Sequence, residues 1–313
     1  MLSRCRWLFS AITAAVLAVG SATAQTPVKA VASFSILGDM VQAIGGSRVS
    51  VTTLVGPDGD AHVFQPAPGD AKAVADAKVV FVNGLGFEGW MERLAQSAGF
   101  KGQVMVATQG IKPNKMKDED DAHGHAQGTD TKKDEHEKID PHAWQDLRNG
   151  LVYADNIAAG LIAADPAGAE TYKANAAAYK KQLQELDAWV KAEIGAVAKA
   201  KRRVITSHDA FGYFGSAYGV TFLAPVGVST DAEPSAKGVA ALIRQIKQQK
   251  IKALFVENIT NPKLVEQIGK ETGVKLGGAL YSDALSKPDG PAGTYIKMFR
   301  NNVPLLKAAM LGN

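Results

Sequence analysis

The sequence predicts an α/β protein with two lobes, each built on a largely parallel sheet, joined by one long rigid helix. The chain has 313 residues, of which 46% are hydrophobic and 21% charged, the composition of a globular protein long enough to form two hydrophobic cores. Short β-branched segments alternate with amphipathic segments in two separate sets, as in parallel sheets. A continuous helical pattern separates the two sets.

The first set predicts the N-terminal lobe, residues 25–164. Its apolar and β-branched runs indicate strands at Val28–Phe34, Val49–Val55, Lys78–Asn83 and Gln103–Thr108. The amphipathic segments between them indicate helices near Ile36–Ile44, Gly69–Asp76 and Glu88–Ala98.

The linking helix is predicted over residues 165–201. Asp165 and Pro166 are typical of a capped helix start with a first-turn proline. Apolar residues then recur at helical spacing at Tyr172, Tyr179, Leu183, Leu186, Val190, Ile194 and Val197. About 33 helical residues would span roughly 50 Å, so we expect a stiff connection between the lobes.

The second set predicts the C-terminal lobe, residues 202–313. Strands are expected at Arg203–Ser207, Val220–Pro225, Ile251–Glu257 and Val274–Leu280, and helices near Pro234–Gln249, Pro262–Thr272 and Thr294–Met310.

Residues 1–24 have the features of a secretory signal peptide. Arg4 and Arg6 precede an apolar run, and Ala22-Thr23-Ala24 forms a cleavage site before Gln25. Removal would take away Cys5, the only cysteine, and lower the net charge from +4 to 4 − 2 = +2. We therefore expect a periplasmic protein without disulfides or a lipid anchor. Its weak charge and lack of a basic arm argue against nucleic-acid binding.

Residues 115–138 interrupt the strand–helix pattern. This segment contains five lysines, eight acidic residues and three histidines, His123, His125 and His136. Because it has too few apolar residues to compensate for its ordering entropy, we predict a mobile loop.

Four candidate metal ligands lie in loops beside predicted strands. They are His62, His142, His208 and Asp283. Ligands of open α/β sheets bind beyond the carboxyl ends of the strands, so these side chains are expected to face one cleft between the lobes. Three imidazoles and one carboxylate suit tetrahedral Zn²⁺. The spacing forms no compact metal motif, and a single loop histidine is more often a surface residue or a helix cap.

Three other patterns do not support an enzyme. Gly84 to Gly89 matches G-x-G-x-x-G, but no acid follows about 20 residues later, which favours a tight strand-to-helix turn. Ser207-His208-Asp209 holds the residue types of a catalytic triad, yet adjacent positions on one loop cannot form the relay. The chain contains no P-loop for ATP hydrolysis.

Five stretches make the chain similar to the zinc/manganese solute-binding proteins of bacterial ABC transporters. They are VVFVNGLGFEGW at 79–90, DPHAW at 140–144, TSHDAFGYF at 206–214, FVEN at 255–258 and YSDALS at 281–286. The resemblance implies two lobes joined by the long helix, one metal in the cleft, and His62, His142, His208 and Asp283 as its ligands. It implies delivery to a membrane permease served by a separate ATPase chain. It also places loop 115–138 near the metal entrance, where His123, His125 and His136 could assist capture; the alternative is a solvated linker.

Within that resemblance, His208 favours zinc. Family members that prefer manganese or iron commonly carry Glu at this position, and a third imidazole shifts the preference toward Zn²⁺. Some members with three histidines and an aspartate are nevertheless associated with manganese, so Mn²⁺ or Fe²⁺ remains an alternative. We expect a monomer whose metal affinity falls as the histidines become protonated.

An exported zinc hydrolase is the second hypothesis. Asp209 or Glu257 would then act as general base, although four protein ligands would leave little room for the water that catalytic zinc activates.

Overall fold

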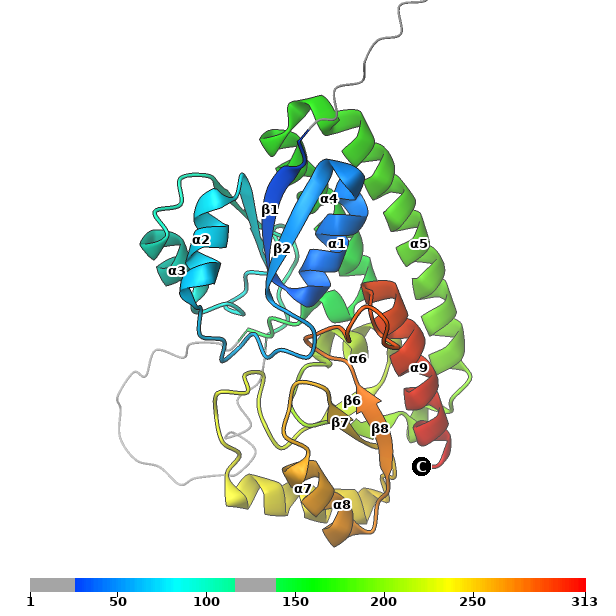
Figure 1. The fold of residues 1–313 in the computed structure, drawn as a ribbon. Helices are drawn as coiled ribbons and strands as arrows, with labels where there is room; N and C mark the ends of the chain where they lie inside the picture. The colour runs from blue at the N-terminus through cyan, green and yellow to red at the C-terminus, as the bar shows by residue number, and fades with distance from the viewer. Residues whose placement is uncertain (1–25, 116–138) are drawn as a thin grey trace, which may run out of the picture.

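Two four-stranded parallel sheets form the two lobes, which confirms the predicted fold class (Figure 1). The computed structural model describes residues 26–115 and 139–313. The strand orders are β2-β1-β3-β4 and β6-β5-β7-β8, so both sheets have the same topology. The proposed signal peptide at 1–24 and the three loop histidines His123, His125 and His136 lie outside the described residues.

The first lobe follows the predicted pattern closely. Its strands are β1 (Val28–Phe34), β2 (Val49–Val55), β3 (Val79–Val82) and β4 (Gln103–Val106). Its helices are α1 (Ser35–Gly45), α2 (Pro68–Asp76) and α3 (Met91–Ser97), with a 3₁₀ turn, η1, at Gly46–Arg48. β3 is buried along its whole length, which explains its uninterrupted Val-Val-Phe-Val sequence.

The second lobe has shorter strands than predicted. They are β5 (Arg203–Ile205), β6 (Thr221–Leu223), β7 (Leu254–Glu257) and β8 (Leu276–Leu280). Its helices are α6 (Gly212–Tyr218), α7 (Ala236–Gln249) and α8 (Lys263–Thr272). Beyond β5, His208 forms an isolated parallel bridge with Val226, and its N–H donates to the Glu257 carboxylate.

The linking helix, α5 (Ala169–Gly195), is shorter than predicted and lies along both lobes (Figure 1). Its 27 residues span about 40 Å. The 3₁₀ turn η4 (Pro166–Gly168) separates Asp165 from the start of α5, so Asp165 does not cap the helix. A second 3₁₀ turn, η5 (Lys199–Lys201), follows the C-terminal end of α5. The Asp165 carboxylate instead accepts hydrogen bonds from Arg48 Nη2 and Tyr172 Oη, both at 2.7 Å. The lobe boundaries at residues 164 and 202 stay a prediction.

A further helix, α4 (Leu147–Ala164), was not predicted. It begins after the 3₁₀ turn η3 (Ala143–Gln145), and its N-cap residue Asp146 accepts a hydrogen bond from the Arg148 N–H. Much of its buried face consists of small residues, Gly150, Ala154, Ala158 and Gly160. Leu147, Tyr153, Ile157 and Leu161 alternate with them at helical spacing, so the pattern of this helix is present in the sequence.

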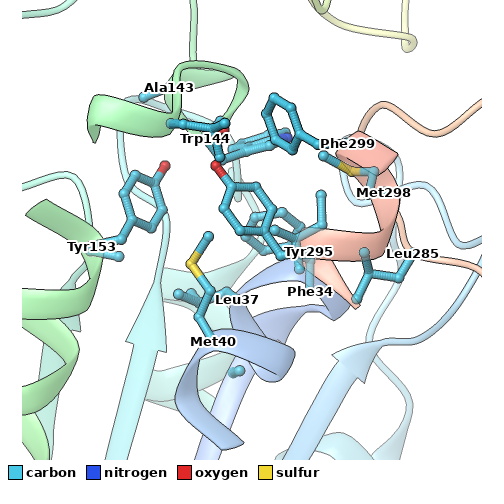
Figure 2. Packing of buried hydrophobic residues seen from close by; sticks show 14 of the residues in the cluster. Phe34, Leu37, Met40, Ala143, Trp144, Tyr153, Leu285, Tyr295, Met298 and Phe299 are labelled. Atoms are coloured by element: carbon cyan, nitrogen blue, oxygen red, sulfur yellow. Dashed lines mark hydrogen bonds between the residues drawn. The ribbon is translucent and has the colours of Figure 1, made fainter. Parts of the chain in front are cut away.

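The final helix, α9 (Tyr295–Leu311), follows the second sheet in the chain, contacts its strands β8 and β5, and packs beside α5 and α1 (Figure 1). Figure 2 shows Tyr295 in one cluster with Phe34 and Trp144 of the first lobe and Leu285 of the second. One hydrophobic core therefore continues between the lobes. A smaller core lies between the second sheet and helices α7 and α8, with Ile205, Ile246, Leu254 and Ile268.

No helix in residues 26–115 or 139–313 combines the length and the apolar character needed to span a bilayer.

Asp39 on α1 fastens the N-terminus of α9. Its Oδ2 accepts a hydrogen bond from the Tyr295 N–H at 2.8 Å. Burial raises the pKa of Asp39 to about 6, although the Tyr295 hydrogen bond and Lys297 oppose the rise. The helix end thus holds a carboxyl group that is partly protonated near pH 6.

The Asp39→Asn substitution should change how stability depends on pH. The folded pKa of about 6 lies above the unfolded value, so the folded state binds this proton more tightly. The stabilisation is present below about pH 4 and is lost as the pH rises through 6. Urea unfolding should therefore show D39N gaining on the wild type between pH 4 and 7, by at most roughly 3 kcal/mol. A stability difference that stays constant over this range would contradict the assignment.

Candidate metal centre

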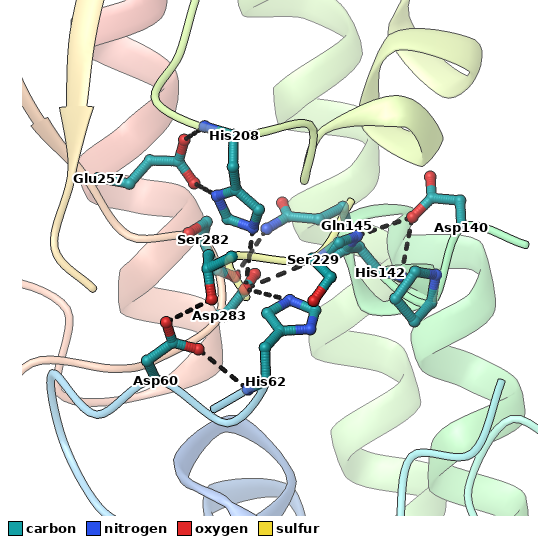
Figure 3. A network of polar contacts seen from close by, with 12 residues as sticks. Asp60, His62, Asp140, His142, Gln145, His208, Ser229, Glu257, Ser282 and Asp283 are labelled. Atoms are coloured by element: carbon teal, nitrogen blue, oxygen red, sulfur yellow. Dashed lines mark hydrogen bonds and ion pairs between the residues drawn. The ribbon is translucent and has the colours of Figure 1, made fainter. Parts of the chain in front are cut away.

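The structure brings together the four side chains that the sequence singled out (Figure 3). His62 follows β2, His142 lies between β4 and η3, His208 follows β5, and Asp283 follows β8. One donor atom from each lies within 4.8 Å of all the others. The carboxyl ends of the two sheets therefore meet at one point between the lobes, as expected for ligand sites of parallel sheets.

Asp283 lies at the centre of the cluster. Its Oδ2 is 3.2 Å from His62 Nε2, 3.5 Å from His142 Nε2 and 3.1 Å from His208 Nε2. Ligands at usual zinc bond lengths in a tetrahedron are about 3.3 Å from each other. The contacts of the aspartate with the three imidazoles therefore match the edges of such a tetrahedron.

The cluster is shielded from water and incompletely hydrogen-bonded. The side chains of His142, His208 and Asp283 are 0% exposed, and that of His62 is 4% exposed. Within the described parts of the chain, His62 Nε2, His142 Nε2 and Asp283 Oδ1 have no hydrogen-bond partner. Buried polar atoms without partners are costly and rare in proteins. Their convergence is what a site for a divalent cation requires.

Carboxylates shift the pKa values of the imidazoles. Burial alone would lower the pKa of His142, but Asp283 and Asp140 raise it to about 9. Burial likewise opposes protonation of His208, yet Glu257 and Asp283 raise its pKa well above the usual value. Burial would raise the pKa of Asp283, whereas His142 and His208 hold it well below its usual range. A metal ion that binds here must therefore displace protons from these rings.

Outer carboxylates surround the histidines (Figure 3). Asp60 Oδ1 accepts the His62 N–H at 2.9 Å, and Asp140 Oδ1 accepts the His142 N–H at 3.0 Å. The same Asp140 oxygen lies 2.8 Å from His142 Nδ1. Sequence analysis did not identify Asp60 or Asp140, although the repeated spacing Asp-x-His could have revealed both. Glu257, considered above as a hydrolytic base, lies against His208.

The first lobe holds the loop that carries Asp283. Trp144 Nε1 and Gln145 Nε2 both donate to the Ser282 carbonyl at 2.9 Å. The Trp144 ring also lies 5.2 Å from the His142 ring. The Leu285 N–H donates to Ser35 Oγ at 2.9 Å. The aspartate of one lobe is thus positioned by the other.

At the turn Gly84–Gly89, a side chain of the protein itself stands where a phosphate would bind. Gly84, Leu85 and Gly86 have positive φ values of 85°, 56° and 81°. The Glu88 carboxylate accepts the N–H groups of Asn83 and Gly84 at 2.6 and 3.1 Å. These are the backbone donors that a phosphate would use in a dinucleotide-binding turn, so the turn is a structural one.

Comparisons with known proteins agree with this geometry. A family model described as zinc-uptake complex component A, periplasmic, matches residues 30–309. The chain is 34% identical over 275 residues to the manganese-binding lipoprotein MntA of Halalkalibacterium halodurans, covering 88% of this chain and 86% of that one. It is 32% identical over 293 residues to the iron ABC transporter substrate-binding lipoprotein MtsA of Streptococcus pyogenes, covering 91% and 89%.

Two solved structures are similar over nearly their whole length. The periplasmic zinc-binding protein TroA of Treponema pallidum has a TM-score of 0.81 at 28% identity, with 91% of this chain and 99% of that chain covered. The Mn-bound periplasmic metal-binding protein of Candidatus Liberibacter asiaticus has a TM-score of 0.77 at 30% identity, with 91% and 100% covered.

Raising the pH should destabilise the metal-free protein through His142. The folded pKa of about 9 lies above the unfolded value of about 6.5, so protonated His142 stabilises the fold below pH 6.5. That contribution is lost as the pH rises through 9 and amounts to at most roughly 3 kcal/mol. Urea unfolding in a chelator at pH 6, 7.5 and 9 should show the loss in the wild type and a smaller loss in His142→Gln. Equal losses of stability in the two proteins would refute the assignment of this pH dependence to His142.

Proposed function

Because this chain belongs to the family of periplasmic zinc-uptake component A, we propose that it captures Zn²⁺ and delivers it to the permease of an ABC importer. The family consists of solute-binding proteins and not of enzymes. The protein is therefore an extracytoplasmic, divalent-metal-binding component of a metal import system.

The donor set is the observation that carries the zinc proposal. Three imidazole nitrogens surround one aspartate oxygen, and the proposed ligands are His62, His142, His208 and Asp283. A nitrogen-rich shell of four protein ligands favours Zn²⁺ over harder ions such as Mn²⁺. Four protein donors also fill a tetrahedron, which suits capture of an ion more than activation of a water molecule. Glu257, the candidate base of a hydrolase, is engaged by His208 instead.

Manganese is the alternative cargo. The relatives named above include one that binds manganese and one that serves an iron transporter. Metal analysis of protein isolated natively from the cell envelope, without overexpression, would separate the two.

The remaining parts of the transport proposal rest on the family. They comprise a separate ATPase subunit and a role for His123, His125 and His136 in capture. Export is proposed from the signal-peptide pattern of residues 1–24, and the binding protein is proposed to be a monomer. The core shared between Phe34, Trp144 and Tyr295 favours release through movement of the ligand loops over wide opening of the lobes.

Substitutions at His208 test the proposed site. The His208→Ala variant removes one of three nitrogen donors, so zinc affinity in a chelator competition titration should fall by at least about 100-fold. The matched His208→Glu variant restores a fourth donor but hardens the shell, so its Mn²⁺ affinity relative to Zn²⁺ should rise. Wild-type zinc affinity in both variants would exclude His208 from the site.

A further inference from the structure

We propose that Glu257 is a positioning residue of the metal centre, which acts through His208 and biases the site toward zinc over manganese. The inference rests on the proposed function, because it concerns the selectivity of the same site. It assigns a role to a buried carboxylate that the four proposed ligands leave unexplained.

Two of the three histidines share a local arrangement that the third lacks. His62 and His142 each donate their backbone N–H to the aspartate two residues earlier, Asp60 or Asp140. The residue two positions before His208 is Thr206, which donates its hydroxyl to the His208 carbonyl at 3.0 Å. The His208 N–H instead donates to Glu257 Oε1 at 2.8 Å. Glu257 thus supplies from β7 the carboxylate that β5 lacks.

The second oxygen of Glu257 reaches the ring. Oε2 makes an ion-pair contact of 2.7 Å with His208 Nδ1, on the ring position at which Asp140 Oδ1 hydrogen-bonds His142 Nδ1 at 2.8 Å. An acceptor at Nδ1 favours the tautomer that carries its hydrogen there. When a metal replaces the proton on Nε2, the lone pair of this nitrogen can point to the ion on the side of the ring that faces Asp283 Oδ2, 3.1 Å away. Glu257 therefore controls which nitrogen is free for a metal.

The pair is buried and held by the neighbouring backbone. Both side chains are 0% exposed. The Glu257 N–H donates to Ser207 Oγ at 3.1 Å, so the residue before His208 and the backbone of Glu257 are tied together. Parallel pairing of β5 with β7 at Ile205 and Leu254 fixes the approach of the two strands.

The chemistry of the pair explains the bias toward zinc. A carboxylate on Nδ1–H makes the opposite nitrogen a stronger electron donor. Zn²⁺ binds imidazole more strongly than Mn²⁺ does, whereas Mn²⁺ suits carboxylate oxygen. Strengthening His208 as a donor therefore benefits zinc more than manganese.

The Glu257→Gln substitution tests the assignment. The backbone N–H and Nδ1 of His208 face different oxygens of Glu257, and the amide replaces one of these oxygens with an NH₂ donor, so it cannot present an acceptor at both positions. Either the ring turns its hydrogen to Nε2, which blocks coordination, or the backbone N–H loses its acceptor. Competition titrations with Zn²⁺ alone and Mn²⁺ alone should show zinc affinity falling about 10- to 100-fold. Manganese affinity should fall less, so the Zn²⁺/Mn²⁺ affinity ratio decreases.

Glu88→Gln is the matched control. Glu88 also accepts two backbone N–H groups, from Asn83 and Gly84, but contacts no histidine by a hydrogen bond or ion pair in the described structure. Its zinc affinity and its Zn²⁺/Mn²⁺ ratio should equal those of the wild type. An E257Q protein with wild-type zinc affinity, or with equal losses for both metals, overturns the inference. A wild type that binds neither metal refutes the proposed function instead.

A measurement on the wild type covers the case in which E257Q does not fold. Nitrogen NMR of ¹⁵N-histidine-labelled, zinc-loaded protein should show His208 protonated at Nδ1 and coordinated through Nε2. Coordination through Nδ1 would overturn the inference.

Discussion

One buried carboxylate, Asp283, is the interaction on which the arrangement of the site depends. A charge removed from water is costly unless it is paired and hydrogen-bonded. Asp283 meets this requirement through three imidazoles that arrive from both lobes. The adjoining Ser282 carbonyl is fixed by Trp144 and Gln145. The loops after β2, β5 and β8 and the loop before η3 must therefore converge for this charge to be accommodated.

The surrounding fold makes that convergence rigid. Helix α5 lies along both lobes, and α9 returns from the second sheet to α1 through the Asp39–Tyr295 hydrogen bond. Tyr295 Oη in turn donates to the Trp144 carbonyl, next to His142. The same aromatic core thus supports the lobe interface and the ligand loops. Such a frame favours pre-organised binding, in which little free energy is lost to ordering the ligands when the ion arrives.

Much of the fold was predictable, because its signals are local. β1 and β2 match their predicted ranges because alternating and continuous apolar runs define strands directly. Helix α4 was missed although Leu147, Tyr153, Ile157 and Leu161 recur at helical spacing on its buried face. Helix α5 was overestimated because 3₁₀ turns stand at both of its predicted ends. The candidate imidazole ligands could be selected because the chain has six histidines and only three of them lie outside residues 115–138.

The outer carboxylates show where prediction from the sequence ends. Asp60 and Asp140 lie two residues before their histidines, so their spacing carries a local signal. Glu257 is 49 residues from His208 in sequence and reaches it only because β7 lies beside β5. No local pattern records that pairing. Which carboxylate supports which imidazole is a property of the sheet order and becomes visible only in the folded protein.

Zinc K-edge absorption spectroscopy of the stoichiometric wild-type complex tests the central claim most directly. The structure predicts four coordination, with three imidazole nitrogens and one carboxylate oxygen at about 2.0–2.2 Å. A spectrum dominated by water oxygens, or one with fewer than three imidazoles, would contradict the convergence of both lobes on a single ion.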